Sequence, residues 1–252
     1  MSRNNSYKWW NLLFFLGVLV VNTLSVTLPL GGNSTSEISD RYHTLLTPAG
    51  YAFSIWSLIY LLLAGFIVYP FRQGTSSRDS VRPISIWFVL SCIFNMGWLF
   101  LWQYLYIELS LAVMLLMLIT LIVIYRKTRS ITSPTPGEQW LVKLPFSLYL
   151  GWISVATIVN VSVVLEKNQW DGFGLSDPTW AVIMLSIGTL LAVIVSFPYR
   201  DRIYPLVFVW AFMAIALEHK DTGSVFITGL VAAGLLLLYS TWLLLTPRRS
   251  KF

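Results

Sequence analysis

The chain has 252 residues, of which 56% are hydrophobic and 11% charged, and its mean hydropathy is +0.71. Soluble domains carry charge on about a quarter of their residues, so this composition excludes an ordinary soluble fold. The net charge of +6 does not indicate nucleic-acid binding, because the basic residues gather in alternate loops between apolar runs.

About eight apolar runs follow one another along the chain, and none of them contains Asp, Glu, Lys, Arg or His. We place the spans near residues 9–30, 48–70, 84–106, 109–125, 144–165, 179–198, 203–217 and 224–246. A helix needs roughly 20 residues to cross a bilayer, and continuous hydrophobicity favours helices over a β-barrel. The sequence therefore predicts an all-α, polytopic membrane helix bundle of about eight transmembrane helices. Charge-free spans also argue against an ion-coupled pump.

The loops between these runs alternate in charge. Fourteen of the 17 basic residues lie at the termini and in every second loop: Arg3, Lys8, Arg72, Arg78, Arg82, Arg126, Lys127, Arg129, Lys143, Arg200, Arg202, Arg248, Arg249 and Lys251. The other loops hold only Arg41, Lys167 and Lys220. Because cytoplasmic loops carry the excess of Lys and Arg, we expect both termini in the cytoplasm. We expect an integral multi-pass protein of the cell (plasma) membrane.

Two connections bear on the arrangement of the helices. The loop Gly31–Thr47 is rich in Gly, Ser and Asn, and it is either a flexible connector or a lid over a cavity. The turn Tyr104–Glu108 is short, so the third and fourth helices should be antiparallel neighbours.

Three helices carry stripes of aromatic and amide residues at helical spacing. The stripes are Phe53, Trp56 and Tyr60; Ser91, Asn95, Trp98 and Trp102; and Trp152, Ala156 and Asn160. An amide is costly in lipid, so Asn95 and Asn160 should face the bundle interior. The stripes either pack helix against helix or line a ligand cavity. Other tryptophans near span ends are expected to be interfacial anchors: Trp9, Trp10, Trp140, Trp170, Trp180 and Trp242.

Catalytic and metal sites are not indicated. His43 and His219 are far apart in sequence without metal-ligand spacing, and Cys92 is the only cysteine. There is no nucleophile elbow and no phosphate-binding glycine loop. The sequence thus predicts no catalytic residue, no metal and no required cofactor.

The same stripes carry a family resemblance. The three segments are Thr47-Pro48-Ala49-Gly50-Tyr51-Ala52-Phe53-Ser54-Ile55-Trp56 followed by Tyr60, then Phe94-Asn95-Met96-Gly97-Trp98, then Pro145 followed by Trp152-Ile153-Ser154-Val155-Ala156-Thr157-Ile158-Val159-Asn160. In this order, over roughly residues 9–165, the chain resembles the TspO/MBR family of translocator proteins or tryptophan-rich sensory proteins.

The resemblance implies a five-helix core at residues 1–168, with a cavity under the loop 31–47. Family members bind porphyrins and other flat apolar molecules, so a bound porphyrin or other apolar ligand is implied here. The matching positions imply a ligand site made of Trp56, Asn95, Trp98, Trp152 and Ala156, with Phe53, Tyr60 and Asn160 as additional candidates.

The chain departs from the family pattern in two places. Ala49 stands where a second proline is common, and residues 169–252 add three helices that the ordinary family lacks. The feature of these helices closest to a site is Tyr204-Pro205 with Trp210. Family members often dimerise through helices that the addition could cover, which leaves a homodimer open.

The favoured function is binding or sensing of a hydrophobic or tetrapyrrole ligand, with the lipid bilayer and that ligand as partners. The alternative is a facilitative permease for an uncharged small solute, which needs access to the site from both sides. An enzyme that degrades porphyrin oxidatively is least favoured, because the chain lacks a conventional acid, base or metal site.

Overall fold

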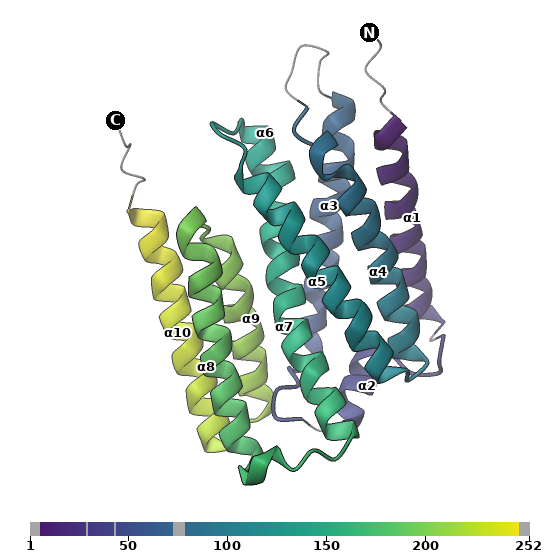
Figure 1. The fold of residues 1–252 in the computed structure, drawn as a ribbon. Coiled ribbons are helices and arrows are strands. Elements are labelled where there is room, and N and C mark those ends of the chain that lie inside the picture. The colour runs from purple at the N-terminus through teal and green to yellow at the C-terminus, as the bar shows by residue number, and fades with distance from the viewer. Residues whose placement is uncertain (1–5, 29, 43, 73–78, 247–252) are drawn as a thin grey trace.

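A computed structural model describes residues 6–28, 30–42, 44–72 and 79–246. Within these residues the fold is helical and has no strand, as predicted (Figure 1). The apolar helices are α1 (Ser6–Thr27), α3 (Ile55–Arg72), α4 (Ser85–Gln103), α5 (Ile107–Arg129), α7 (Leu144–Lys167), α8 (Asp177–Ser196), α9 (Ile203–Glu218) and α10 (Gly223–Leu245). Two short helices, α2 (Thr35–Arg41) and α6 (Pro136–Glu138), lie in loops.

The helices have the length and the surface of membrane spans. Seven helical segments are long and apolar enough to cross a bilayer. The eighth, α9, has 16 residues, or about 24 Å at 1.5 Å per residue, and it runs alongside α8 and α10 (Figure 1). Large apolar side chains point outward, among them Leu238 at 69% and Leu61 at 69% exposure. So much exposed apolar surface needs lipid, and the chain is an integral membrane protein.

Helix boundaries differ from the predicted ones where local chemistry extends a helix. The span predicted at 109–125 is α5, which continues to Arg129. Its last turn holds Arg126, Lys127 and Arg129, and basic residues there complement the negative end of the helix dipole. The span predicted from 144 is preceded by α6 and a π-helical turn, Gln139–Lys143. A 3₁₀ turn, Gly50–Ser54, leads into α3.

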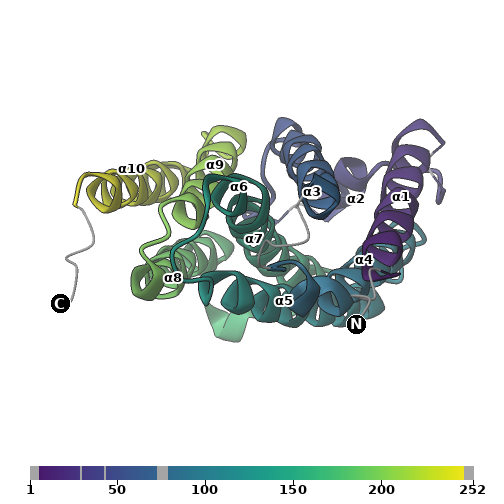
Figure 2. The same ribbon diagram turned by 90° about the horizontal axis from the view of Figure 1, so that it is seen from above.

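Helix α7 joins two groups of helices. On one side α1, α3, α4, α5 and α7 pack together, with α4 and α5 as the predicted antiparallel neighbours. On the other side α8, α9 and α10 form a second group beyond α7 (Figure 2). Helix α9 approaches α7 at Gly151, where an added Cβ would lie 2.9 Å from Val207. A small residue allows this close approach, which is how helices associate in lipid.

The two ends of the bundle differ in charge. We call them the α2 end and the α6 end after the short helices that lie there (Figure 1). The first turn of α1 and the last turn of α10 both lie at the α6 end, which fits an even number of crossings. The described basic residues of the larger predicted set belong to helix ends and loops on that side: Lys8, Arg72, Arg82, Arg126, Lys127, Arg129, Lys143, Arg200 and Arg202. The others, Arg3, Arg78, Arg248, Arg249 and Lys251, lie outside the described residues.

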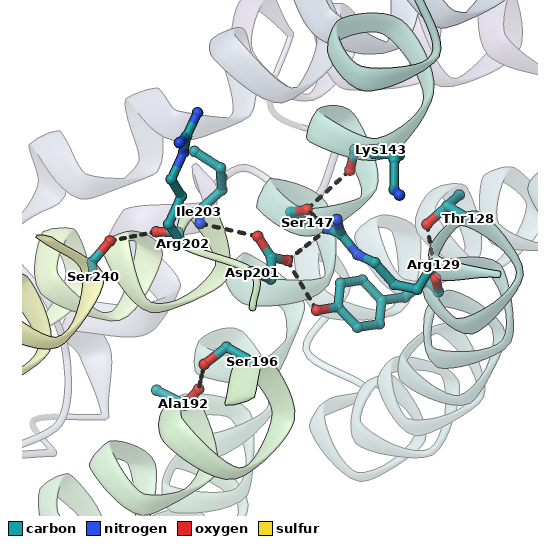
Figure 3. Close-up of polar contacts among 11 residues, drawn as sticks. Thr128, Arg129, Lys143, Ser147, Ala192, Ser196, Asp201, Arg202, Ile203 and Ser240 are labelled. Carbon is teal, nitrogen blue, oxygen red and sulfur yellow. Dashed lines mark hydrogen bonds and ion pairs between the residues drawn. The ribbon is translucent and has the colours of Figure 1, made fainter. Parts of the chain in front are cut away.

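At the α6 end a buried ion pair links the two helix groups (Figure 3). Arg129 of α5 lies 2.6 Å from a carboxylate oxygen of Asp201, and both side chains are at most 10% exposed. The same oxygen accepts a hydrogen bond from Tyr125 at 2.9 Å, and the other oxygen accepts one from the backbone N–H of Ile203 at 3.0 Å. Arg129 also donates to Ser147 of α7. One carboxylate therefore connects α5 to the start of α9.

Candidate functional site

The three predicted stripes meet at one cavity near the α2 end. Trp56 of α3 lies between the tryptophans of α4 and α7, with its ring centroid 6.4 Å from that of Trp98 and 6.4 Å from that of Trp152. The cavity is lined by Thr35, Ser39, Pro48, Phe53, Trp56, Trp98, Trp102, Trp152, Val155, Ala156, Val159 and Asn160. We call it the tryptophan cavity. Of the eight candidate residues, Asn95 and Tyr60 are not in its lining.

The segment 31–47, interpreted as a connector or a lid, contains a short helix that covers this cavity. Helix α2 contributes Thr35 and Ser39 to the lining. Its first turn is closed by a capping box, in which the Ser34 backbone N–H donates to the Glu37 carboxylate at 2.6 Å. That hydrogen bond lowers the pKa of Glu37 below its usual value of 4.5. The lid is held to α4 where Trp102 Nε1 donates to the Thr35 carbonyl at 3.2 Å.

Two polar groups of the lining are buried without a hydrogen-bond partner among the described residues. They are the hydroxyl of Ser39 on the lid and Nε1 of Trp152 on α7, and these residues are 1% and 2% exposed. By contrast, Trp98 Nε1 donates to Asn160 Oδ1 at 3.2 Å, and Asn160 donates to the Ser110 hydroxyl at 3.3 Å. An unpaired buried donor costs about 1–3 kcal/mol, so the tryptophan cavity carries a cost that a ligand acceptor would remove.

Asn95 lies one helical turn from Trp98, in a hydrogen-bonded layer on the α6 side of the cavity. Its Nδ2 donates to the Tyr149 hydroxyl at 3.2 Å, and its Oδ1 accepts from Asn22 Nδ2 at 3.1 Å. Tyr60 stacks on Trp56 and donates to Asn22 Oδ1 at 2.8 Å. The amide predicted to contact a ligand is thus already paired by protein groups.

A second layer follows further toward the α6 end. Phe66, Phe88 and Phe146 are each 0% exposed. Their ring centroids are 4.9 to 6.2 Å apart. These rings fill the space between α3, α4 and α7. The tryptophan cavity is therefore closed on its α6 side by a polar layer and then by an aromatic layer.

The tryptophan cavity is small, with a volume of about 30 Å³. A larger crevice of about 350 Å³ lies between α5, α7, α8 and α9. Its two buried tyrosine hydroxyls are already paired, because Tyr204 donates to the Ser154 hydroxyl at 2.9 Å and Tyr125 donates to Asp201. We therefore assign the site to the smaller cavity, where aromatic faces and unpaired polar groups occur together.

Sequence reasoning overlooked several lining residues. Trp102 belongs to the predicted stripe on α4, so its spacing from Trp98 could have placed it in the site. Ser34 and Glu37 have the spacing of a capping box, which is a signal for the lid helix. Nothing in the sequence indicates that Ser39 faces the cavity.

Comparison with known proteins gives one match. A family model described as TSPO-like protein matches residues 8–242, which spans both helix groups. No curated protein and no solved structure matches the chain. Because the match runs through most of α10, the last three helices lie within what that family model describes. The division into residues 1–168 and 169–252 stays a prediction.

Proposed function

The chain belongs to the TSPO-like protein family, and we propose that it binds a flat hydrophobic ligand of the porphyrin class in the tryptophan cavity, as a sensor or modulator. The observation that carries the proposal is a pair of buried polar groups, on Ser39 and Trp152, that have no hydrogen-bond partner among the described residues and face a cavity lined mainly by aromatic and aliphatic side chains. Trp56, Trp98 and Trp152 would offer ring faces to the ligand, and Ser39 and Trp152 would hydrogen-bond its polar edge.

Binding of such a ligand requires the cavity to open. A volume of about 30 Å³ holds about two or three water molecules at about 10–15 Å³ each, whereas ligand pockets measure roughly 300–1,000 Å³. The lid is the part most easily displaced, since α2 has only seven residues and a helix that short is not stable by itself. Ligand entry would therefore begin with the release of Thr35 from Trp102.

Two features support binding over transport or catalysis. A permease needs access from both sides, but the hydrogen-bonded layer around Asn95 and the rings around Phe66 close the α6 side. Among the described residues, the cavity lining contains no Asp, Glu, His, Cys, Lys or Arg. General acid–base chemistry needs a titratable side chain within hydrogen-bond reach of the substrate, so this cavity suits a binding site.

The test is a porphyrin titration of the purified protein, followed by the absorbance of the porphyrin band. Ala156→Phe places a ring in the cavity wall and should abolish saturable binding. The control is Leu238→Phe, which adds the same ring to a side chain that is 69% exposed on α10, and it should bind as the wild type does. Unchanged affinity in a folded Ala156→Phe protein would reject the proposed site.

A further inference from the structure

A second cavity lies at the α2 end, at the junction of the two helix groups. It has a volume of about 140 Å³ and lies between the C-terminal end of α7, the start of α8 and the segment 44–46. It shares no lining residue with the tryptophan cavity. A cavity of about 150 Å³ in another protein accommodates benzene, so this space suits a small organic group.

The rim of this cavity carries uncompensated negative charge. Glu166 in the last turn of α7 and Asp177 in the first turn of α8 both line it. Neither carboxylate has an ion-pair partner among the described residues. The neighbouring base, Lys167, is paired instead with Glu108 of α5 at 2.8 Å. A cationic ligand would therefore meet two carboxylates that no basic side chain of the described residues neutralises.

The wall beside these carboxylates is aromatic and held in place. Trp170 and Trp180 line the cavity, with ring centroids 5.0 Å apart and planes inclined by 53°. Trp180 Nε1 donates to the Gly172 carbonyl at 2.7 Å, which fixes its ring. Gly172 has φ +63, and an added Cβ would lie 3.0 Å from Trp180 Nε1, so a larger residue would be strained at this contact. The face of an aromatic ring attracts an organic cation even at an exposed site.

We propose that this cavity binds an organic ammonium group, as a soluble amine or as the headgroup of a lipid. The alkyl groups would contact Trp170, Trp180 and Met184, and the positive nitrogen would lie near Glu166 and Asp177. Interfacial anchoring, the role predicted for Trp170 and Trp180, requires neither a cavity nor carboxylates. The proposal is independent of porphyrin binding, which concerns the other cavity.

The probe is choline, measured by calorimetric titration against dimethylbutanol, its uncharged analogue with carbon in place of nitrogen. In a maltoside detergent, we expect choline to bind about tenfold more tightly, because the analogue lacks the ion pairs and the cation–π contact. The double variant Glu166→Gln/Asp177→Asn should reduce that preference to the part that the cation–π contact supplies, about two- to fivefold. The matched control, Glu218→Gln/Asp221→Asn, neutralises two carboxylates at the same end that do not line the cavity, and it should keep the preference.

Lipid nanodiscs separate the two sources of the ammonium group. Choline binding in phosphatidylglycerol discs but not in phosphatidylcholine discs would show that a lipid headgroup occupies the site. Binding in both would show that the site takes soluble amines. Equal affinity for choline and its uncharged analogue, or no difference between the two double variants, would overturn the proposal, as would no choline binding in maltoside.

Discussion

The two tryptophans of the cavity wall should respond differently to the same substitution. Trp98 and Trp152 are 6% and 2% exposed, so replacing either with Phe removes the same atoms from a similar environment. Trp98→Phe also loses a hydrogen bond to Asn160, worth about 1 kcal/mol. Trp152→Phe removes a donor that has no partner among the described residues, which relieves about 1–3 kcal/mol. Trp152→Phe should therefore be more stable than Trp98→Phe by about 2–4 kcal/mol.

The measurement is reversible chemical unfolding of both variants in the same detergent. The shared packing loss cancels in the difference between them, so only the hydrogen-bonding term remains. In the same Trp152→Phe protein, porphyrin affinity should fall by about 2- to 10-fold, the value of one net hydrogen bond. Equal destabilisation of the two variants would refute the reasoning, because it would mean that Nε1 of Trp152 is already satisfied.

Three further outcomes are expected. Ser39→Ala removes the other unpaired cavity group, so unfolding stability should be unchanged or higher while titration shows porphyrin affinity reduced by about 2- to 10-fold. The pKa of Glu37 is lowered by Ser34, so its capping contribution is present above the usual value of 4.5 and lost as the pH falls through the lowered value. Below the lowered pKa of Glu37 the lid helix loses this capping contribution, so porphyrin association should accelerate. Glu37→Gln should abolish this pH dependence of the association rate in stopped-flow traces. Reporter fusions after residues 75 and 172 should report opposite sides of the membrane, and the same side for both would contradict the eight-span topology.

Much of this fold could be predicted because a bilayer constrains helices so strongly. Each span must satisfy the hydrogen bonds of its own backbone, so a charge-free apolar run of the right length predicts a transmembrane helix. Helical spacing likewise fixes which face of α3, α4 and α7 a side chain occupies. Together with the family resemblance, this spacing predicts that Trp56, Trp98 and Trp152 face one shared space, and the structure places their rings together.

The hydrogen-bond and ion-pair partners of individual side chains could not be predicted in the same way. Spacing places Asn95 on the face of Trp98, but it does not reveal that Asn22 and Tyr149 pair with its amide. The charge pattern alone places Arg129 among the loop charges, whereas the structure pairs it with Asp201, 72 positions away. Such contacts depend on how separate helices meet, and no local pattern encodes them.

That ion pair links the far end of the bundle to the candidate site through α9. At the α2 end, α9 holds the segment that leads into α3: the Ala49 N–H donates to the Ala214 carbonyl at 3.2 Å. Trp210 Nε1 donates to the Ala52 carbonyl at 3.1 Å. Pro48 and Phe53, which flank these positions, line the tryptophan cavity. A shift of α9 should therefore alter the cavity wall.

Asp201→Asn tests this link. The amide can still accept from Ile203, but it leaves Arg129 buried without a counter-charge, and breaking a buried pair in this way costs about 3–5 kcal/mol. Replacing both partners often restores stability, so Arg129→Met/Asp201→Asn should recover most of the loss. Unfolding and porphyrin titration of both variants should show stability and affinity falling together in Asp201→Asn and recovering together in the double variant. If affinity stays at the wild-type value while stability falls, α9 does not transmit the change, and the ion pair only joins the two helix groups.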